Sequence, residues 1–104
     1  MDKLNFFKNI KIDKNKEQFF ELLSNDKVRV EKIVSNGQIT PNNEWYDQDE
    51  NEFVLLLEGH AIIEFEDKEV ELNKGDYLII EKHIRHRVKY TSKNESSIWL
   101  AVFY

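Results

Sequence analysis

From Val28 onward, apolar and polar residues alternate in short segments, and this alternation constrains the fold more than any other feature of the sequence. A period of two is typical of β-strands that bury one face, whereas a helix repeats every 3.6 residues. The predicted strands cover residues 28–34, 53–58, 60–65, 69–72, 77–80, 86–91 and 97–103. Short strands that follow one another with no helix between them predict an antiparallel sandwich or barrel.

The first part of the chain has a different pattern. Residues 14–23 read KNKEQFFELL, and their spacing predicts one short amphipathic helix. Its apolar side would carry Phe19, Phe20, Leu22 and Leu23. We therefore predict an N-terminal segment, residues 1–27, whose helix packs on a barrel formed by residues 28–104.

Composition excludes several classes of function. The chain has 104 residues, enough for one core, and a net charge of −5 with interleaved signs, so no basic stripe indicates nucleic acid binding. It has no Cys, which excludes disulfides, thiolate metal sites and Cys nucleophiles. The longest uncharged apolar run, residues 53–57, is too short to cross a bilayer, and residues 1–14 lack the apolar core of a signal peptide. We expect a cytoplasmic protein without a membrane partner.

Two apolar segments indicate contact with another surface. Residues 53–57 are apolar on both faces of their predicted strand, so that strand needs cover outside the barrel as well as inside. The chain also ends on WLAVFY, residues 99–104, without a polar tail. A strand this apolar is expected to be packed, either within the fold or at an interface, and we predict a homodimer.

One carboxylate and one imidazole are predicted to point into the barrel. Glu52 alternates in step with Val54 and Leu56, which are expected to be buried. His86 alternates in step with Val88 and Tyr90 of its own strand. A buried carboxylate without a partner is costly, so Glu52 needs a cation or hydrogen-bond donors. Alternatively, Glu52 lies at the barrel mouth, solvated or paired with Arg85 or Arg87, and His86 is a satisfied core residue. Together, the two inward groups predict a pocket.

The same two residues fall into a known pattern. Glu52 is separated from Gly59 by six residues, and Gly75 is followed by DYLII and, after five further residues, by His86. Residues 46–90 therefore resemble the cupin superfamily of small jelly-roll barrels, whose first motif ends in Glu, six residues and Gly, and whose second runs from Gly to His. The resemblance implies an all-β antiparallel jelly-roll (cupin) β-barrel, here with one short N-terminal helix.

The sequence departs from the family at its metal ligands. The resemblance implies three His and one Glu, but the first two His positions hold Tyr46 and Gln48, or Trp45 and Asp47 if the spacing is counted one residue longer. Gln is a weaker ligand than imidazole for transition metals. Such a set would bind a divalent ion (Mn, Fe, Ni or Zn) weakly, with open water positions, or bind no ion. The candidate ligands are Gln48, Glu52 and His86.

Three further residues are candidates for lining the pocket. Tyr46 stands in a motif position, and Tyr90 shares the predicted inward parity of His86. His83 stands where the second motif has Gly, so it is either a turn residue with positive φ or a second imidazole near His86.

Several functions remain open at this point. The resemblance implies a fold shared by isomerases, dioxygenases, lyases, decarboxylases and sugar epimerases, and fold does not fix function. Our leading hypothesis is a divalent-metal pocket for a small polar or carboxylate molecule, with or without catalysis of an unknown reaction. One alternative is a metal-free module that binds a small ligand. The other is a structural domain without catalysis, whose outer strands mediate association.

Overall fold

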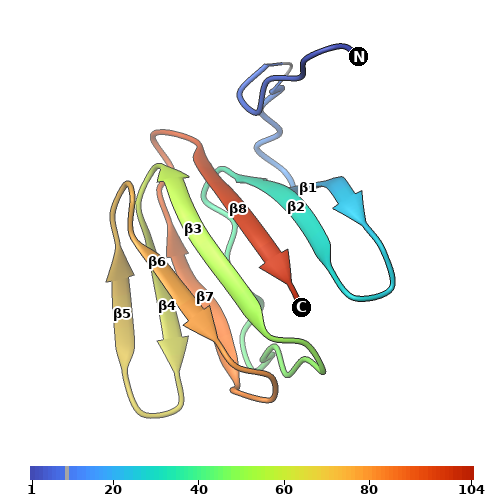
Figure 1. The fold of residues 1–104 in the computed structure, drawn as a ribbon. Helices are drawn as coiled ribbons and strands as arrows, with labels where there is room; N and C mark the ends of the chain where they lie inside the picture. Colours follow the sequence, from blue (N-terminus) through green and yellow to red (C-terminus); the bar gives the residue numbers. More distant parts are fainter. Residues whose placement is uncertain (9) are drawn as a thin grey trace.

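The computed structural model describes residues 1–8 and 10–104, and in this part of the chain it contains two antiparallel β-sheets (Figure 1). The strands are β1 Gln18–Ser24, β2 Arg29–Ser35, β3 Glu52–Glu58, β4 Ala61–Phe65, β5 Glu69–Leu72, β6 Tyr77–Ile80, β7 His86–Thr91 and β8 Ser97–Phe103. One sheet has the order β1-β2-β8-β3-β6, and the other has the order β5-β4-β7. The predicted all-β antiparallel architecture is confirmed.

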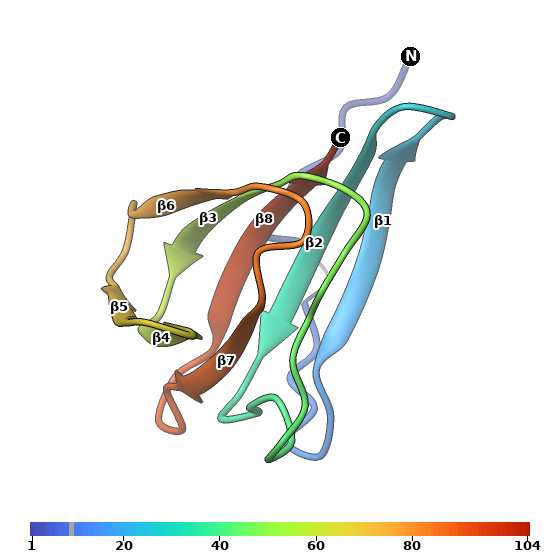
Figure 2. The same ribbon diagram turned by 90° about the horizontal axis from the view of Figure 1, so that it is seen from below.

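The two sheets face each other as an open sandwich, so the jelly-roll barrel that the resemblance implied is not closed in this structure (Figure 2). On one side, the link between β2 and β3 covers the gap between the sheets. It follows β7 through isolated contacts: Thr40 N–H donates to the Val88 carbonyl at 2.9 Å, and Tyr46 forms a single β-bridge with His86. This link also holds Pro41, which has no N–H to donate to a strand ladder.

The predicted N-terminal helix is also wrong. Its residues form β1, which pairs antiparallel with β2, so that Phe19 lies opposite Ile33. A helix this short is marginal in water, whereas the edge of β2 supplies partners for the backbone N–H and C=O groups. The described residues contain no helix, and thus none of the long apolar helices that cross a membrane. The division into residues 1–27 and 28–104 stays a prediction.

The core lies between the sheets, where alternate residues of each strand point inward. Leu56 and Ala61 are fully buried, and Trp99 of β8 packs in the same cluster. The turn after β3 depends on Gly59, whose φ is +97° and where a Cβ would lie 2.6 Å from the Cα of Ser97. Only glycine fits there without displacing backbone.

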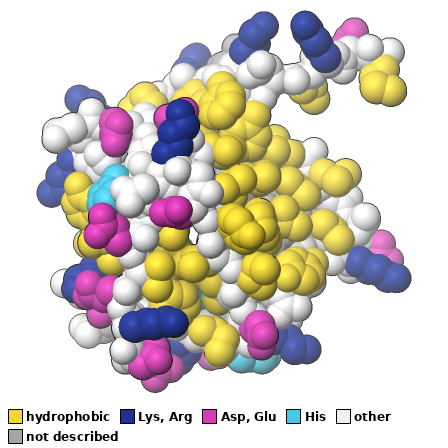
Figure 3. Space-filling model, turned by 60° about the vertical axis from the view of Figure 1, so that its left-hand side comes forward, with side chains coloured by type: hydrophobic (Ala, Val, Ile, Leu, Met, Phe, Trp, Pro, Cys, Tyr) yellow, Lys and Arg dark blue, Asp and Glu magenta, His cyan; other side chains and the backbone are white. Residues whose placement is uncertain are grey.

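The outer face of the five-stranded sheet is largely apolar. Phe53 of β3 stacks on Tyr77 of β6 with ring centroids 5.1 Å apart, and Ile79 beside them is exposed. Hydrophobic side chains gather over one broad area of the surface (Figure 3). Further along the sheet, the N-terminal segment covers Lys32 of β2, whose Nζ donates to the Phe6 carbonyl at 3.0 Å.

Candidate functional site

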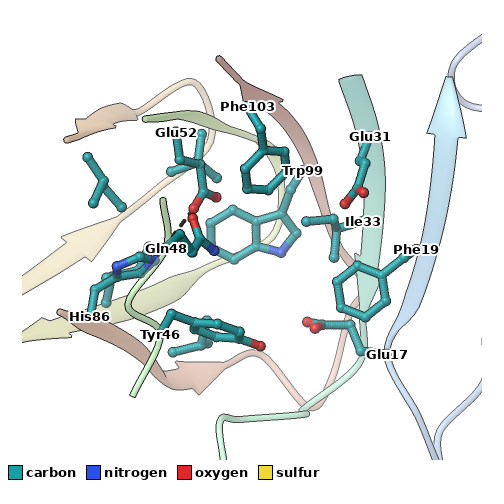
Figure 4. A pocket seen from close by; sticks show the side chains of 14 residues that line it. Glu17, Phe19, Glu31, Ile33, Tyr46, Gln48, Glu52, His86, Trp99 and Phe103 are labelled. Atoms are coloured by element: carbon teal, nitrogen blue, oxygen red, sulfur yellow. Dashed lines mark ion pairs between the residues drawn. The ribbon is translucent and has the colours of Figure 1, made fainter. Parts of the chain in front are cut away.

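A cavity of about 90 Å³ lies between the two sheets, and side chains from both sheets and from the link before β3 line it (Figure 4). By volume it can hold a few water molecules, at roughly 30 Å³ each, or one small organic molecule. Its polar lining residues are Glu17, Glu31, Tyr46, Gln48, Glu52 and His86. Its apolar lining residues are Phe19, Ile33, Val54, Ile63, Ile80, Val88, Trp99 and Phe103.

Glu52 and His86 form an ion pair that spans the two sheets. Glu52 begins β3 and His86 begins β7, and their side chains meet with Oε1 3.5 Å from Nε2. Both side chains are buried, at 10% and 6% exposure. The structure therefore brings together the two inward groups on which the sequence argument depended.

A backbone contact fixes the imidazole of His86. Its Nδ1 lies 2.9 Å from the carbonyl oxygen of Ile84, so Nδ1 carries a proton and Nε2 is the atom turned toward Glu52. Burial by itself lowers the pKa of His86, but the carboxylate of Glu52 and the carbonyl of Ile84 together outweigh it and raise the pKa above 6.5. The raised pKa therefore favours a proton at Nε2, between the imidazole and the carboxylate of Glu52.

Two further carboxylates line the cavity, and the sequence analysis missed both. Glu31 of β2 pairs with the guanidinium of Arg29, at 2.9 Å from its Nε. Glu17, just before β1, accepts a hydrogen bond from the hydroxyl of Ser35. Burial raises the pKa of Glu17, and the bond from Ser35 offsets part of that effect. Glu31 has the same strand parity as Ile33, and applying that parity would have revealed it. Glu17 lay within the segment predicted as a helix, so the sequence pattern gave no sign that it faces the cavity.

Trp99 contributes a hydrogen-bond donor without an acceptor. Its indole Nε1 is buried and has no partner among the described residues, while the whole residue is only 3% exposed. Figure 4 shows the indole nitrogen turned toward the cavity on the side of Ile33. An unsatisfied buried donor costs roughly 1–3 kcal/mol, so this group favours an acceptor inside the cavity.

Tyr46 and Gln48 reach the cavity from the link before β3. Tyr46 is held by two backbone hydrogen bonds with His86, of 2.8 and 3.2 Å, and its ring lies 5.6 Å from the imidazole. Burial, together with the charges of Glu17 and Glu52, raises the pKa of Tyr46, so its hydroxyl stays protonated. The side chain of Gln48 lies beside Glu52 (Figure 4).

The structure places the other two pocket candidates elsewhere. His83 is exposed in the turn before β7, with φ of 66°, and its Nδ1 contacts Asp47 at 2.9 Å. It thus takes the glycine-like turn conformation of its motif position. Tyr90 is not among the residues that line the cavity, because Val88 pairs with Ile63 and Tyr90 with the adjacent Ile62. The extra residue between Val88 and Tyr90 reverses the parity of the strand.

These residues do not fit a tightly held transition-metal ion. The candidate ligands comprise one imidazole, one carboxylate and one neutral amide, whereas a catalytic zinc site has three strong protein ligands. Within the part of the chain that the structure describes, no three His, Cys, Asp or Glu side chains gather in a metal-binding arrangement. Metal binding through Gln48, Glu52 and His86 stays a prediction, and we derive no chemistry from it.

Comparison with known proteins agrees with this architecture. Residues 31–103 match the family model described as Cupin domain. A crystal structure from Ralstonia eutropha JMP134, of a protein named as a putative mannose-6-phosphate isomerase, is 35% identical, with a TM-score of 0.94 over 99% of this chain and 97% of its own. No curated protein matches the chain.

Two more distant structures share the fold alone. A cupin superfamily protein from Desulfitobacterium hafniense DCB-2 is 21% identical, with a TM-score of 0.76 over 90% of this chain and 82% of its own. An RmlC-like cupin protein from Desulfovibrio desulfuricans is 14% identical, with a TM-score of 0.76 over 99% and 94%. From the family match and the 35% identical relative, we conclude that this chain belongs to the cupin family.

Proposed function

We propose that this cupin domain binds a small polar molecule in the cavity between its sheets and that binding requires no resident metal. The observation that carries the proposal is the indole N–H of Trp99, a buried donor that faces the cavity and has no partner among the residues that the structure describes. An acceptor on a bound molecule would satisfy it. The Glu52–His86 pair on the other side of the indole supplies further polar contacts. The cupin family often binds metal, but the donor set of this chain supports the metal-free alternative.

A second candidate is an enzyme that transfers protons, and the geometry of His86 favours it. The imidazole is held by Ile84 and presents Nε2 beside Glu52 within the cavity. General acid–base catalysis needs a titratable group within hydrogen-bond reach of the substrate. The name of the Ralstonia eutropha neighbour, an isomerase, is consistent with this candidate but identifies neither substrate nor reaction here.

We further propose that the apolar outer face of the five-stranded sheet binds a second copy of this chain. Exposed apolar side chains of β6 continue there into the half-buried ones of β3 and β8. A symmetric dimer places the same patch on both sides of its interface, so a flat apolar sheet face can complement itself.

Trp99 provides the readout for a test of binding. The chain has two Trp residues, so a Trp45→Phe variant leaves a single indole N–H signal in a proton–nitrogen NMR spectrum, that of Trp99. Trp45 lies outside the cavity, beside Arg85 and Arg87. Chelator-treated protein, checked by elemental analysis, is titrated with a library of neutral, cationic and anionic small molecules. We expect members of one charge class to shift the Trp99 signal at submillimolar to millimolar concentrations.

The control variant is Ile33→Phe, which places a larger side chain in the cavity and should abolish the shift. If no library member moves the signal, the binding proposal is overturned. If stoichiometric Mn, Fe, Ni or Zn binds and the shift requires it, the metal-free part is overturned instead. A Tyr46→His/Gln48→His variant, which restores the imidazoles of the family pattern, serves as the positive control for metal binding.

A further inference from the structure

The charges around the cavity are unbalanced. Three carboxylates line it, and none of its described lining residues is Lys or Arg. Glu52 has His86 as a partner, and Glu31 has Arg29 at the rim. Glu17 forms no ion pair with any described residue, and its carboxylate accepts a hydrogen bond from the hydroxyl of Ser35. Within the described part of the chain, one carboxylate in the cavity therefore has no cation beside it even when His86 is protonated.

The position of Glu17 makes this imbalance costly. The carboxylate is partly withdrawn from water, and its raised pKa has burial as the main cause. Figure 4 shows it beside the ring of Phe19, with the hydroxyl of Tyr46 pointing toward it. Desolvation of an unpaired carboxylate is unfavourable, and a cation placed next to it would remove much of that cost.

The aromatic side chains that line the cavity favour an organic cation, such as an ammonium group. Four aromatic side chains line it: Phe19, Tyr46, Trp99 and Phe103. Aromatic faces attract ammonium and guanidinium groups within about 6 Å of the ring centroid. One of these rings already does so, because the guanidinium carbon of Arg29 lies 4.2 Å from the centroid of Phe103.

Trp99 adds a second requirement for the ligand, namely a hydrogen-bond acceptor. Its indole N–H has no partner within residues 1–8 and 10–104, faces the same cavity and needs an acceptor, in a residue only 3% exposed. A simple metal cation or an alkylammonium ion without an oxygen atom would leave this donor unsatisfied. The two requirements are independent, since one comes from charge and the other from hydrogen bonding.

We propose that the ligand is a small organic cation that also carries a hydrogen-bond acceptor, with the cation beside Glu17 and the acceptor at Trp99 Nε1. This proposal rests on the proposed binding function and narrows it to one charge class. It departs from the carboxylate molecule expected from the sequence, because an anion would meet Glu17 without any Lys or Arg among the described lining residues. Amino alcohols and their methylated forms have the required chemistry.

Matched compounds separate charge from hydrogen bonding. Choline carries both features, 3,3-dimethylbutan-1-ol has the same shape without the charge, and propyltrimethylammonium has the charge without the hydroxyl. The anion is 3,3-dimethylbutanoate. Each is titrated against the Trp99 indole signal in the Trp45→Phe protein. We expect choline to bind about tenfold more tightly than the neutral alcohol and about threefold more tightly than propyltrimethylammonium, and the anion to bind most weakly.

A matched pair of variants locates the charge effect. Glu17→Gln keeps an oxygen for the Ser35 hydroxyl but removes the charge, so the preference for choline over the alcohol should vanish. Glu95→Gln makes the same change of charge in an exposed loop and should keep the preference. The compound series with Glu17 intact does not depend on whether the variant folds.

The outcomes separate this inference from the proposed function. If the alcohol or the anion binds at least as tightly as choline, the charge class is overturned while cavity binding stands. If none of the four compounds moves the Trp99 signal, the inference is likewise overturned, and the wider library decides the binding proposal. Tight choline binding that Glu17→Gln leaves unchanged would also overturn it.

Discussion

Each face of the five-stranded sheet has exceptions to the usual distribution of polar and apolar side chains. On the inner face, β2 and β3 place Glu31 and Glu52 against the cavity. On the outer face, the adjacent residue of β3 is Phe53, and Ile79 of β6 is 61% exposed. Burial alone favours carboxylates outside and apolar groups inside. Both exceptions include residues of β3, which indicates that each face of this strand contacts something other than bulk water.

The largest expected effect is a difference in the free energy of unfolding between a core residue on the inner face of β3 and its neighbour on the outer face. Leu56 is fully buried in the core, whereas Leu55, the preceding residue, points outward and is half-buried. Leu56→Ala should lower the free energy of unfolding by about 3 kcal/mol, because it leaves a cavity in the core. Leu55→Ala should cost roughly 1 kcal/mol, since less apolar area returns to water. Urea unfolding of both variants at low protein concentration measures the difference, and equal costs would contradict the assignment of the two faces.

The next prediction concerns dimer formation through the outer face of the five-stranded sheet. A Tyr77→Lys/Ile79→Lys variant places two charges on this face, where both side chains are exposed. We expect the native chain to scatter light as a dimer, at twice 12.5 kDa, and the variant to scatter as a monomer with unchanged ligand binding. Tyr90→Lys, a similar change on the other sheet, should leave the dimer intact. A native chain that is monomeric at 100 µM would overturn the proposed dimer.

Most of the fold was predictable because the alternation of side chains is a local property of each strand. The predicted strands from β2 to β8 agree with the observed ones within one residue at each end. The failures lie where an irregularity interrupts the alternation. In β1 the register shifts between Glu21 and Leu23, so the strand does not alternate regularly there. The consecutive apolar residues Leu22 and Leu23 therefore fit the spacing of a helix as well as that of a strand. The decisive partner, the free edge of β2, is invisible in a local pattern.

The same reason limits what the sequence reveals about the site. Glu52 and His86 were predictable because each lies in a regular part of its strand before any bulge. Tyr90 was misplaced because the register of β7 shifts after Val88. Glu17 and Trp99 Nε1, which carry the proposed specificity, became visible only in three dimensions. The absence of partners depends on the surrounding side chains rather than on spacing.

The smallest expected effect concerns the pair that connects the inner face with the second sheet. Because the folded-state pKa of His86 is raised above 6.5, folding favours the protonated imidazole. The stabilisation from His86 is therefore fully present below pH 6.5 and is lost as the pH rises through the folded-state pKa. The free energy of unfolding of the native chain, minus that of His86→Gln, should decrease along this range in urea titrations.

Subtracting the free energy of unfolding of His86→Gln removes the contribution of Glu17. The raised pKa of Glu17 makes the free energy of unfolding fall with rising pH in both proteins. Glu52→Gln provides the control within the pair, because without the carboxylate the burial of His86 favours the neutral imidazole and the slope should flatten or reverse. A slope that persists unchanged in Glu52→Gln would show that Glu52 does not hold the proton on His86. The two groups would then act separately, and only Glu17 and Trp99 would remain to distinguish the polar inner face from the apolar outer one.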